Sequence, residues 1–155
     1  MSISVVLFSL LLLYPQRQGM LFRNNFETEL EQISRTTALG VSLALKNNDF
    51  EGLSEVLNLG DNSSDLEFIA IVERDSTGRR TVFASRPEGV TDQKILQPDS
   101  SSFLIKSSRL STTFLEGDVI LAVSNEVIEE AIFEINYPIY IFLGILIAVS
   151  LGGFF

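Results

Sequence analysis

The residue types that usually carry out catalysis are missing from this 155-residue chain. It contains no histidine and no cysteine, which removes the commonest general base, the commonest transition-metal ligand and any thiolate metal site. It also has no nucleophile elbow of the form G-x-S-x-G, no phosphate-binding loop and no dinucleotide fingerprint. We therefore predict that the chain is not an enzyme, that it has no catalytic residues and that it needs no cofactor.

Carboxylates are abundant, but their spacing does not form a recognisable site. Glu129 and Glu130 are neighbours on a predicted helix beside an apolar segment, rather than in a predicted cleft. Asp61, Asn62 and Asp65 offer oxygen ligands, but the ligand spacing and the terminal glutamate of a calcium loop are missing. We predict an ordinary loop at that position and no metal site.

All the charge of the chain lies between two apolar ends. The 11 basic and 20 acidic residues give a net charge of −9, and all of them fall between Arg17 and Glu134. A strongly acidic domain argues against nucleic acid, which requires a basic surface, and against anionic lipid headgroups. Residues 16–136 have the size of one domain.

The apolar ends occupy residues 3–14 and 137–155. As a helix at about 1.5 Å per residue, the second would reach about 28 Å, against about 30 Å for the hydrocarbon core of a bilayer. It suits either a lipid-facing anchor or a packed helix interface. The first lacks the basic start and the cleavage site of a signal peptide. We predict transmembrane segments at 1–15 and 137–155, both incomplete, so that the chain is expected to be part of a longer protein.

Residues 20–47 show the periodicity of one long helix. Asp49 is placed to cap a second helix over 50–59, closed by Gly60, and residues 61–65 read as a loop. A small face at Thr37, Gly40 and Ala44 suits either a close helix–helix contact or packing on a sheet. The stripe of the long helix repeats at steps of three and four residues: Phe26, Leu30, Ile33, Thr37, Val41 and Ala44.

A set of strands follows, so the fold class is α+β. The run at 66–73 is almost wholly apolar and is predicted to be central in its sheet. A turn at 75–78 precedes an antiparallel return strand, and residues 86–101 read as a long irregular connection. From Asn125 a helical pattern runs directly into the second apolar segment. The further predicted strands are 80–85, 102–110, 111–116 and 118–124.

This order of elements resembles the extracytoplasmic PAS-like sensor domains of the Cache type, which occur in bacterial sensor kinases, chemoreceptors and nucleotide-cyclase receptors. Three stretches carry the resemblance. Residues 26–57 resemble the long helix and the short helix after it, 68–85 the first hairpin with its Asp-x-x-Gly turn, and 118–132 the last strand with the exit helix. Together they cover about half of the chain, and all three are patterns of apolar spacing rather than tight motifs.

The resemblance implies a long N-terminal helix packed on an antiparallel PAS-like sheet, flanked by two transmembrane helices. It implies a homodimer through the stripe of the long helix, and a small-molecule ligand held on one sheet face under the long loop. Seven polar residues could converge there, and four of them are the candidate ligand-binding residues: Arg86, Lys106, Arg109 and Glu73. The other three are Arg74, Ser85 and Ser124. Arg86 and Lys106 are the expected anchors for an anionic ligand, because guanidinium groups pair with carboxylates in a bidentate way.

The resemblance also places the protein in the inner (cytoplasmic) membrane, in contact with membrane lipid, with the domain on the periplasmic side. Arg17 and Arg23 taken alone would favour a cytoplasmic domain. Two functions stay open. The first is the sensory input module of a membrane receptor, in which a ligand or partner shifts the last strand, the exit helix and the second transmembrane helix. The second is a non-catalytic accessory or structural subunit of a larger membrane complex, anchored by both apolar segments.

Overall fold

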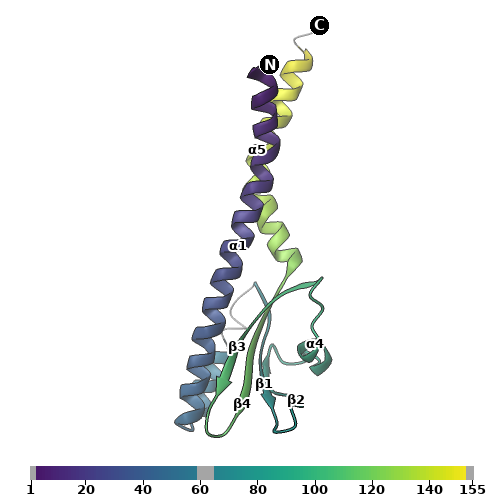
Figure 1. Ribbon diagram of the computed structural model, residues 1–155. Helices are drawn as coiled ribbons and strands as arrows, with labels where there is room; N and C mark the ends of the chain where they lie inside the picture. The colour runs from purple at the N-terminus through teal and green to yellow at the C-terminus, as the bar shows by residue number, and fades with distance from the viewer. Residues whose placement is uncertain (1–2, 59–64, 153–155) are drawn as a thin grey trace. The chain divides into compact units, whose positions relative to one another are not determined.

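The computed structural model describes the backbone of residues 3–58 and 65–152, and side-chain surroundings within 13–58 and 65–146 (Figure 1). These residues form two compact units, which we describe separately. The sheet unit comprises Glu27–Val127. The helical unit comprises Met1–Phe26 together with Ile128–Phe155.

The first helix, α1, is a single element from Ile3 to Lys46. The predicted helix over 20–47 is confirmed, and the same helix begins at Ile3 and continues unbroken through Pro15. A proline inside a helix removes one N–H donor and disturbs the preceding turn without necessarily ending the helix.

A tight corner separates α1 from the second helix, α2, which spans Phe50–Leu57. Asn48 adopts a left-handed backbone conformation, with φ of 55°. The Asp49 carboxylate then accepts a hydrogen bond from the backbone N–H of Gly52 at 2.9 Å, which confirms the predicted cap. The predicted closure at Gly60 and most of the predicted loop at 61–65 lie outside the described residues.

Four antiparallel strands form one sheet in the order β2-β1-β4-β3. The strands are β1 (Leu66–Arg74), β2 (Arg80–Arg86), β3 (Phe103–Ser111) and β4 (Glu116–Ser124). The central place predicted for the first strand is confirmed. The strand predicted at 102–110 is confirmed as β3, whereas the separate strand predicted at 111–116 is wrong. Thr112 instead closes a tight turn, with its backbone N–H donating to the Leu115 carbonyl at 2.9 Å and its hydroxyl accepting from the Leu115 N–H at 3.0 Å.

One sheet face is covered by the connection between β2 and β3. This loop face carries the side chains of Phe68, Ala70, Val72, Ile120 and Ala122, all buried. The connection is not wholly irregular as predicted, because it contains a short helix, α4, at Asp92–Leu96. Ile95 of that helix is fully buried against the loop face, which explains why the helix forms there.

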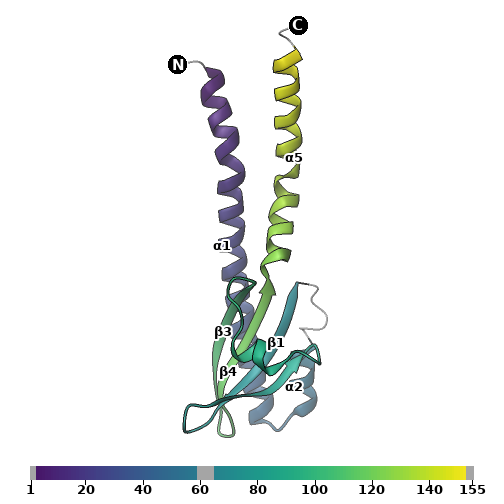
Figure 2. The same cartoon turned by 90° about the vertical axis from the view of Figure 1, so that its right-hand side faces the viewer.

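The opposite face, which we call the helix face, carries Ile69, Ile71, Val119, Leu121 and Val123, again all buried. Helix α1 lies against it, as Figures 1 and 2 show. A hydrogen bond of 2.9 Å from the hydroxyl of Ser34 on α1 to that of Ser108 on β3 joins the two elements. The sheet unit is therefore an α+β fold with a long N-terminal helix packed on a four-stranded antiparallel sheet.

The last helix, α5, spans Asn125–Gly152 and begins at the residue after β4. The Ser124 hydroxyl accepts a hydrogen bond from the backbone N–H of Glu126 at 3.2 Å, which caps the start of α5. Within the described part of the chain, no helix combines the length and the apolar composition needed to cross a membrane.

Substitution of Gly117 tests the packing of the central strands. Gly117 pairs with Glu73 of β1, and a Cβ atom there would overlap the backbone carbonyl of Val72. We expect Gly117→Ala to lower the free energy of unfolding by about 1–3 kcal/mol, because the overlap is with backbone that cannot move aside. Urea unfolding followed by circular dichroism measures this. Gly144→Ala is the control, because a Cβ there meets nothing within 4 Å. Equal stability of the two variants would contradict the packing described here.

The turn between β1 and β2 makes a prediction about pH. The Asp75 carboxylate accepts hydrogen bonds from the Thr77 hydroxyl at 2.6 Å and from the backbone N–H groups of Thr77 and Arg79 at 2.8 and 2.9 Å. The Thr77 hydroxyl in particular lowers the pKa of Asp75. The stabilisation is therefore complete above the unfolded-state pKa and is lost as the pH falls through the lower folded-state pKa. Carboxyl NMR titration should find Asp75 below the ordinary aspartate pKa, and Thr77→Val should raise it. An ordinary pKa in the unmodified protein would refute this account of the turn.

Candidate functional site

The four predicted ligand-binding residues do not lie together. Lys106 and Arg109 are both on β3, but they are three residues apart and so point to opposite faces. Lys106 is opposite Leu121 on the helix face, whereas Arg109 is opposite Asp118 on the loop face. Glu73 lies near the end of β1. Arg86 ends β2, at the other edge of the sheet from β3.

Each of the cations in this set has a partner within the chain. The guanidinium of Arg109 contacts the Glu116 carboxylate at 2.7 Å, and that of Arg86 lies 3.3 Å from Glu88 and donates to the Ser85 carbonyl at 3.1 Å. Lys106 lies 3.3 Å from Glu27 on α1. The Arg109–Glu116 pair is exposed, and exposed ion pairs contribute about 0–1 kcal/mol, whereas the side chains of Lys106 and Arg86 are only 25% exposed.

The sheet face under the long connection is filled with apolar side chains. Ile95 is fully buried there, and Val90 and Leu96 pack beside it. At the edge of this core, the Lys94 ammonium lies 4.8 Å from the centre of the Phe103 ring and 2.6 Å from the Glu67 carboxylate. The described residues thus form a closed core in the middle of this face, and a polar pocket of about 230 Å³ at its end is lined by Arg74, Arg109 and Asp118 among others.

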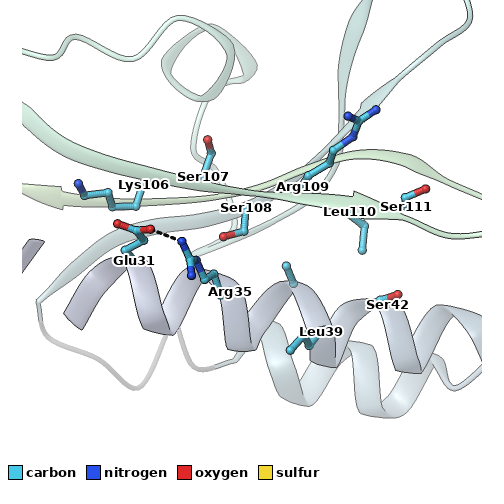
Figure 3. A pocket seen from close by; sticks show the side chains of 11 residues that line it. Glu31, Arg35, Leu39, Ser42, Lys106, Ser107, Ser108, Arg109, Leu110 and Ser111 are labelled. Atoms are coloured by element: carbon cyan, nitrogen blue, oxygen red, sulfur yellow. Dashed lines mark hydrogen bonds and ion pairs between the residues drawn. The ribbon is translucent and has the colours of Figure 1, made fainter. Parts of the chain in front are cut away.

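An open groove instead runs between α1 and the edge strand β3 (Figure 3), with a volume of about 740 Å³. Arg35 and Glu31 of α1 form an ion pair of 2.6 Å on its helix side. Lys106 and Ser108 line its strand side, and the Lys106 side chain is only 25% exposed. In Figure 3 the Arg109 side chain projects away from α1, in agreement with the register.

The only sequence signal for Arg35 was its position four residues after Glu31, on the polar flank of the apolar stripe. The structure adds that this flank faces β3. Two cationic side chains beside serine hydroxyls can hold a small anion such as a carboxylate or a phosphate. The groove is the candidate binding site of the sheet unit.

A second groove lies on the other flank of α1, with a volume of about 680 Å³ and a more apolar lining that includes Ile33 and Val56. Gly40 allows a close approach here, because a Cβ on it would lie 3.2 Å from a methyl group of Val56 on α2. Thr37 and Ala44 are buried. The small face of α1 therefore packs inside the chain, against α2 and the helix face.

The six residues predicted for a dimer helix have different surroundings within one chain. Leu30, Thr37, Val41 and Ala44 are buried, Phe26 is half-buried and Ile33 is 39% exposed. The large apolar side chains that α1 leaves open near them are Leu39, 72% exposed, and Leu43, 61% exposed. A partner of this part of α1 would therefore meet Ile33, Leu39 and Leu43.

Neither metal ligands nor known relatives add to this site. Among the described residues, no three acidic side chains gather in a way that could hold a metal ion. Of the predicted loop at 61–65, only Asp65 belongs to the described residues. No protein-family model matches the sequence, and no curated protein does either.

The groove predicts selective stabilisation by small anions. We expect at least one of acetate, malonate and phosphate to raise the melting temperature, since a ligand at 100 times its Kd stabilises by about 2.7 kcal/mol. Lys106→Gln and Arg35→Gln should each reduce that ligand-induced shift. Arg79→Gln, in the exposed turn after β1, should leave it unchanged and serves as the control. Differential scanning fluorimetry measures the shifts. Identical shifts in all variants would contradict an anion site in the groove.

Proposed function

We propose that this chain is the sensory input module of a membrane receptor of the Cache type. In this proposal residues 16–136 form the sensor domain on the periplasmic side of the inner membrane, and the segments at 1–15 and 137–155 enter the bilayer. The domain has no catalytic role. Its task is to pass a shift, induced by a ligand or a partner, into α5.

The observation that carries the proposal is the direct junction of β4 with α5. Strand β4 ends at Ser124 and the helix begins at Asn125, with no glycine or proline between them. The Asn125 side chain donates to the Ser101 carbonyl at 2.8 Å, and its backbone N–H donates to the Ser102 carbonyl at 2.9 Å. The first residue of α5 is thus bound to the segment that precedes β3.

The candidate groove is well placed to act on this junction. Strand β3, which forms one wall of the groove, pairs with β4 along its whole length, from Phe103 opposite Ser124 to Ser111 opposite Glu116. An anion held between Lys106 and Arg35 would bias the position of β3 relative to α1. Helix displacements of about 1–2 Å are the usual scale of such switching.

The apolar surface of α5 supports a membrane location. Glu134 is the last charged residue of the sequence, and many large apolar side chains after it are exposed in the single chain. The apolar sequence continues to Phe155, beyond Leu146, the last residue whose side-chain surroundings the structure describes. A helix that is apolar all round requires lipid or protein around it. The homodimer of the proposal would use Ile33, Leu39 and Leu43 of α1 in the same way.

An accessory subunit of a larger membrane complex is the second candidate function. It is favoured by the loop face, where Ile95 and its neighbours form a closed core. In that case the exposed side chains of α1 and α5 would be covered by neighbouring subunits, and the groove beside β3 would hold a protein segment.

A labelling experiment tests location and orientation together. Because the chain has no cysteine, Ser76→Cys in the exposed turn after β1 gives a single reactive thiol. We expect the protein to stay in the membrane pellet after alkaline carbonate extraction. A membrane-impermeant maleimide should label Ser76→Cys in intact cells.

Ala70→Cys is the matched control, because Ala70 is fully buried and its thiol should react only after unfolding. Extraction by carbonate would reject the membrane segments. Labelling of Ser76→Cys only after the cells are opened would place the domain in the cytoplasm and reject the periplasmic sensor. Carbonate-resistant protein that purifies only with other subunits would favour the accessory role.

A further inference from the structure

The two helices of the helical unit meet at a close contact that fixes their register. Figures 1 and 2 show the first part of α1 and the body of α5 side by side and antiparallel. A Cβ atom on Gly19 would lie 3.2 Å from a methyl group of Ile132. Glycine therefore permits the close approach, and Gly19 and Ile132 lie at the same level along the pair.

This register brings tyrosines of the two helices to one level. Tyr14 lies five residues before Gly19 and Tyr137 lies five residues after Ile132. At about 1.5 Å per residue, each lies about 7.5 Å from the contact, in the same direction because the helices are antiparallel. Tyr140 follows about 4.5 Å further along α5.

The charged residues end at a matching level. Arg17 is the first charged residue of the sequence and lies two residues before Gly19. Glu134 is the last and lies two residues after Ile132. Both are therefore about 3 Å from the contact, on the tyrosine side of it. The change from charged to uncharged sequence occurs at one level on both helices, just before the tyrosines.

The tyrosine side chains have the surroundings expected at a boundary between water and lipid. Tyr14, Tyr137 and Tyr140 are 51%, 52% and 46% exposed. The Tyr14 hydroxyl accepts a hydrogen bond of 2.9 Å from the side chain of Gln18, which lies toward the charged side. The Phe133 ring contacts both α5 tyrosines, tilted against Tyr137 with a centroid distance of 5.9 Å and stacked on Tyr140 at 6.1 Å. Tyrosine favours this position because its ring is apolar and its hydroxyl is polar.

From these levels we infer that the surface of a lipid bilayer crosses the helical unit at Tyr14, Tyr137 and Tyr140. The inference rests on the proposed function, because it requires both apolar segments to enter lipid. Lipid fits this surface better than a second copy does. Between Tyr137 and Leu146 only Ile139 and Leu143 are not exposed, whereas a partner helix would cover a single stripe.

Tryptophan fluorescence tests the inference without background, because the chain has no tryptophan. Single variants Tyr14→Trp, Tyr137→Trp, Ile145→Trp and Phe83→Trp of the full protein are placed in phosphatidylcholine vesicles. The lipids carry bromine, a quencher, either near the headgroup or deep in the acyl chains. All four sites are exposed, so the substitutions preserve the packing, and circular dichroism checks this.

We expect Tyr14→Trp and Tyr137→Trp to be quenched mainly by the shallow bromines, with the same ratio of shallow to deep quenching. Ile145→Trp should be quenched more by the deep bromines, and Phe83→Trp on β2 should not be quenched. If Ile145→Trp escapes both bromines, the membrane function fails together with the inference. If Ile145→Trp is quenched while Tyr14→Trp and Tyr137→Trp report different depths, only the inference is overturned. If a tryptophan variant unfolds, a cysteine carrying a nitroxide label is placed at the same position instead. The accessibility of the label to oxygen and to a polar nickel complex then measures the depth of that position in the bilayer.

Discussion

Burial of the central strand pair on both faces is the constraint on which the sheet unit depends. Strands β1 and β4 present apolar side chains to the loop face and to the helix face, and nearly all of these are fully buried. A sheet of this kind needs cover on both sides. Helix α1 covers one side, which explains the burial of Leu30, Val41 and Ala44. The connection between β2 and β3 covers the other side, which explains why Ile95 and its short helix pack where they do.

Because both faces of the sheet are covered, the polar and charged side chains of the sheet unit lie mainly at its edges. Among the described residues, the middle of the two central strands carries buried apolar side chains, and the charged groups lie at the ends of these strands, on the outer strands and on the flanks of α1. The groove beside β3 forms for this reason, because an edge strand next to a helix leaves side chains of both elements open to water. Lys106 and Arg35 share that groove although they come from distant parts of the sequence. The proposed sensor would thus read its ligand beside the core rather than inside it.

The helical unit depends on a different kind of contact. A glycine on α1 against an isoleucine on α5 allows close packing, and the pair then buries Asn136, which is 1% exposed. The Asn136 side chain donates to the Ile132 carbonyl at 2.9 Å, while its own carbonyl oxygen has no hydrogen-bond partner among the described residues. A buried polar group of this kind costs about 1–3 kcal/mol, so apolar packing of the two helices must offset it. Both helices also contain a proline near this level, Pro15 and Pro138, and each removes one backbone N–H donor from its helix.

The sequence by itself determined the elements that depend on interactions between residues close together in the chain. The central strand, the Asp75 turn, the Asp49 cap and the start of α5 were all predicted correctly, because propensity, turn chemistry and capping are short-range effects. Tertiary structure decided the rest. Whether α1 continued through Pro15, and whether residues after Ser111 formed a strand or a turn, depended on packing and on turn hydrogen bonds. Lys106 and Arg109 were separated because side chains alternate along a strand, and Lys106 joined Arg35 because β3 lies beside α1. Spacing in the sequence gives the distance between two residues along the chain. Only the strand register and the packing of the elements decide whether those two residues lie on the same face.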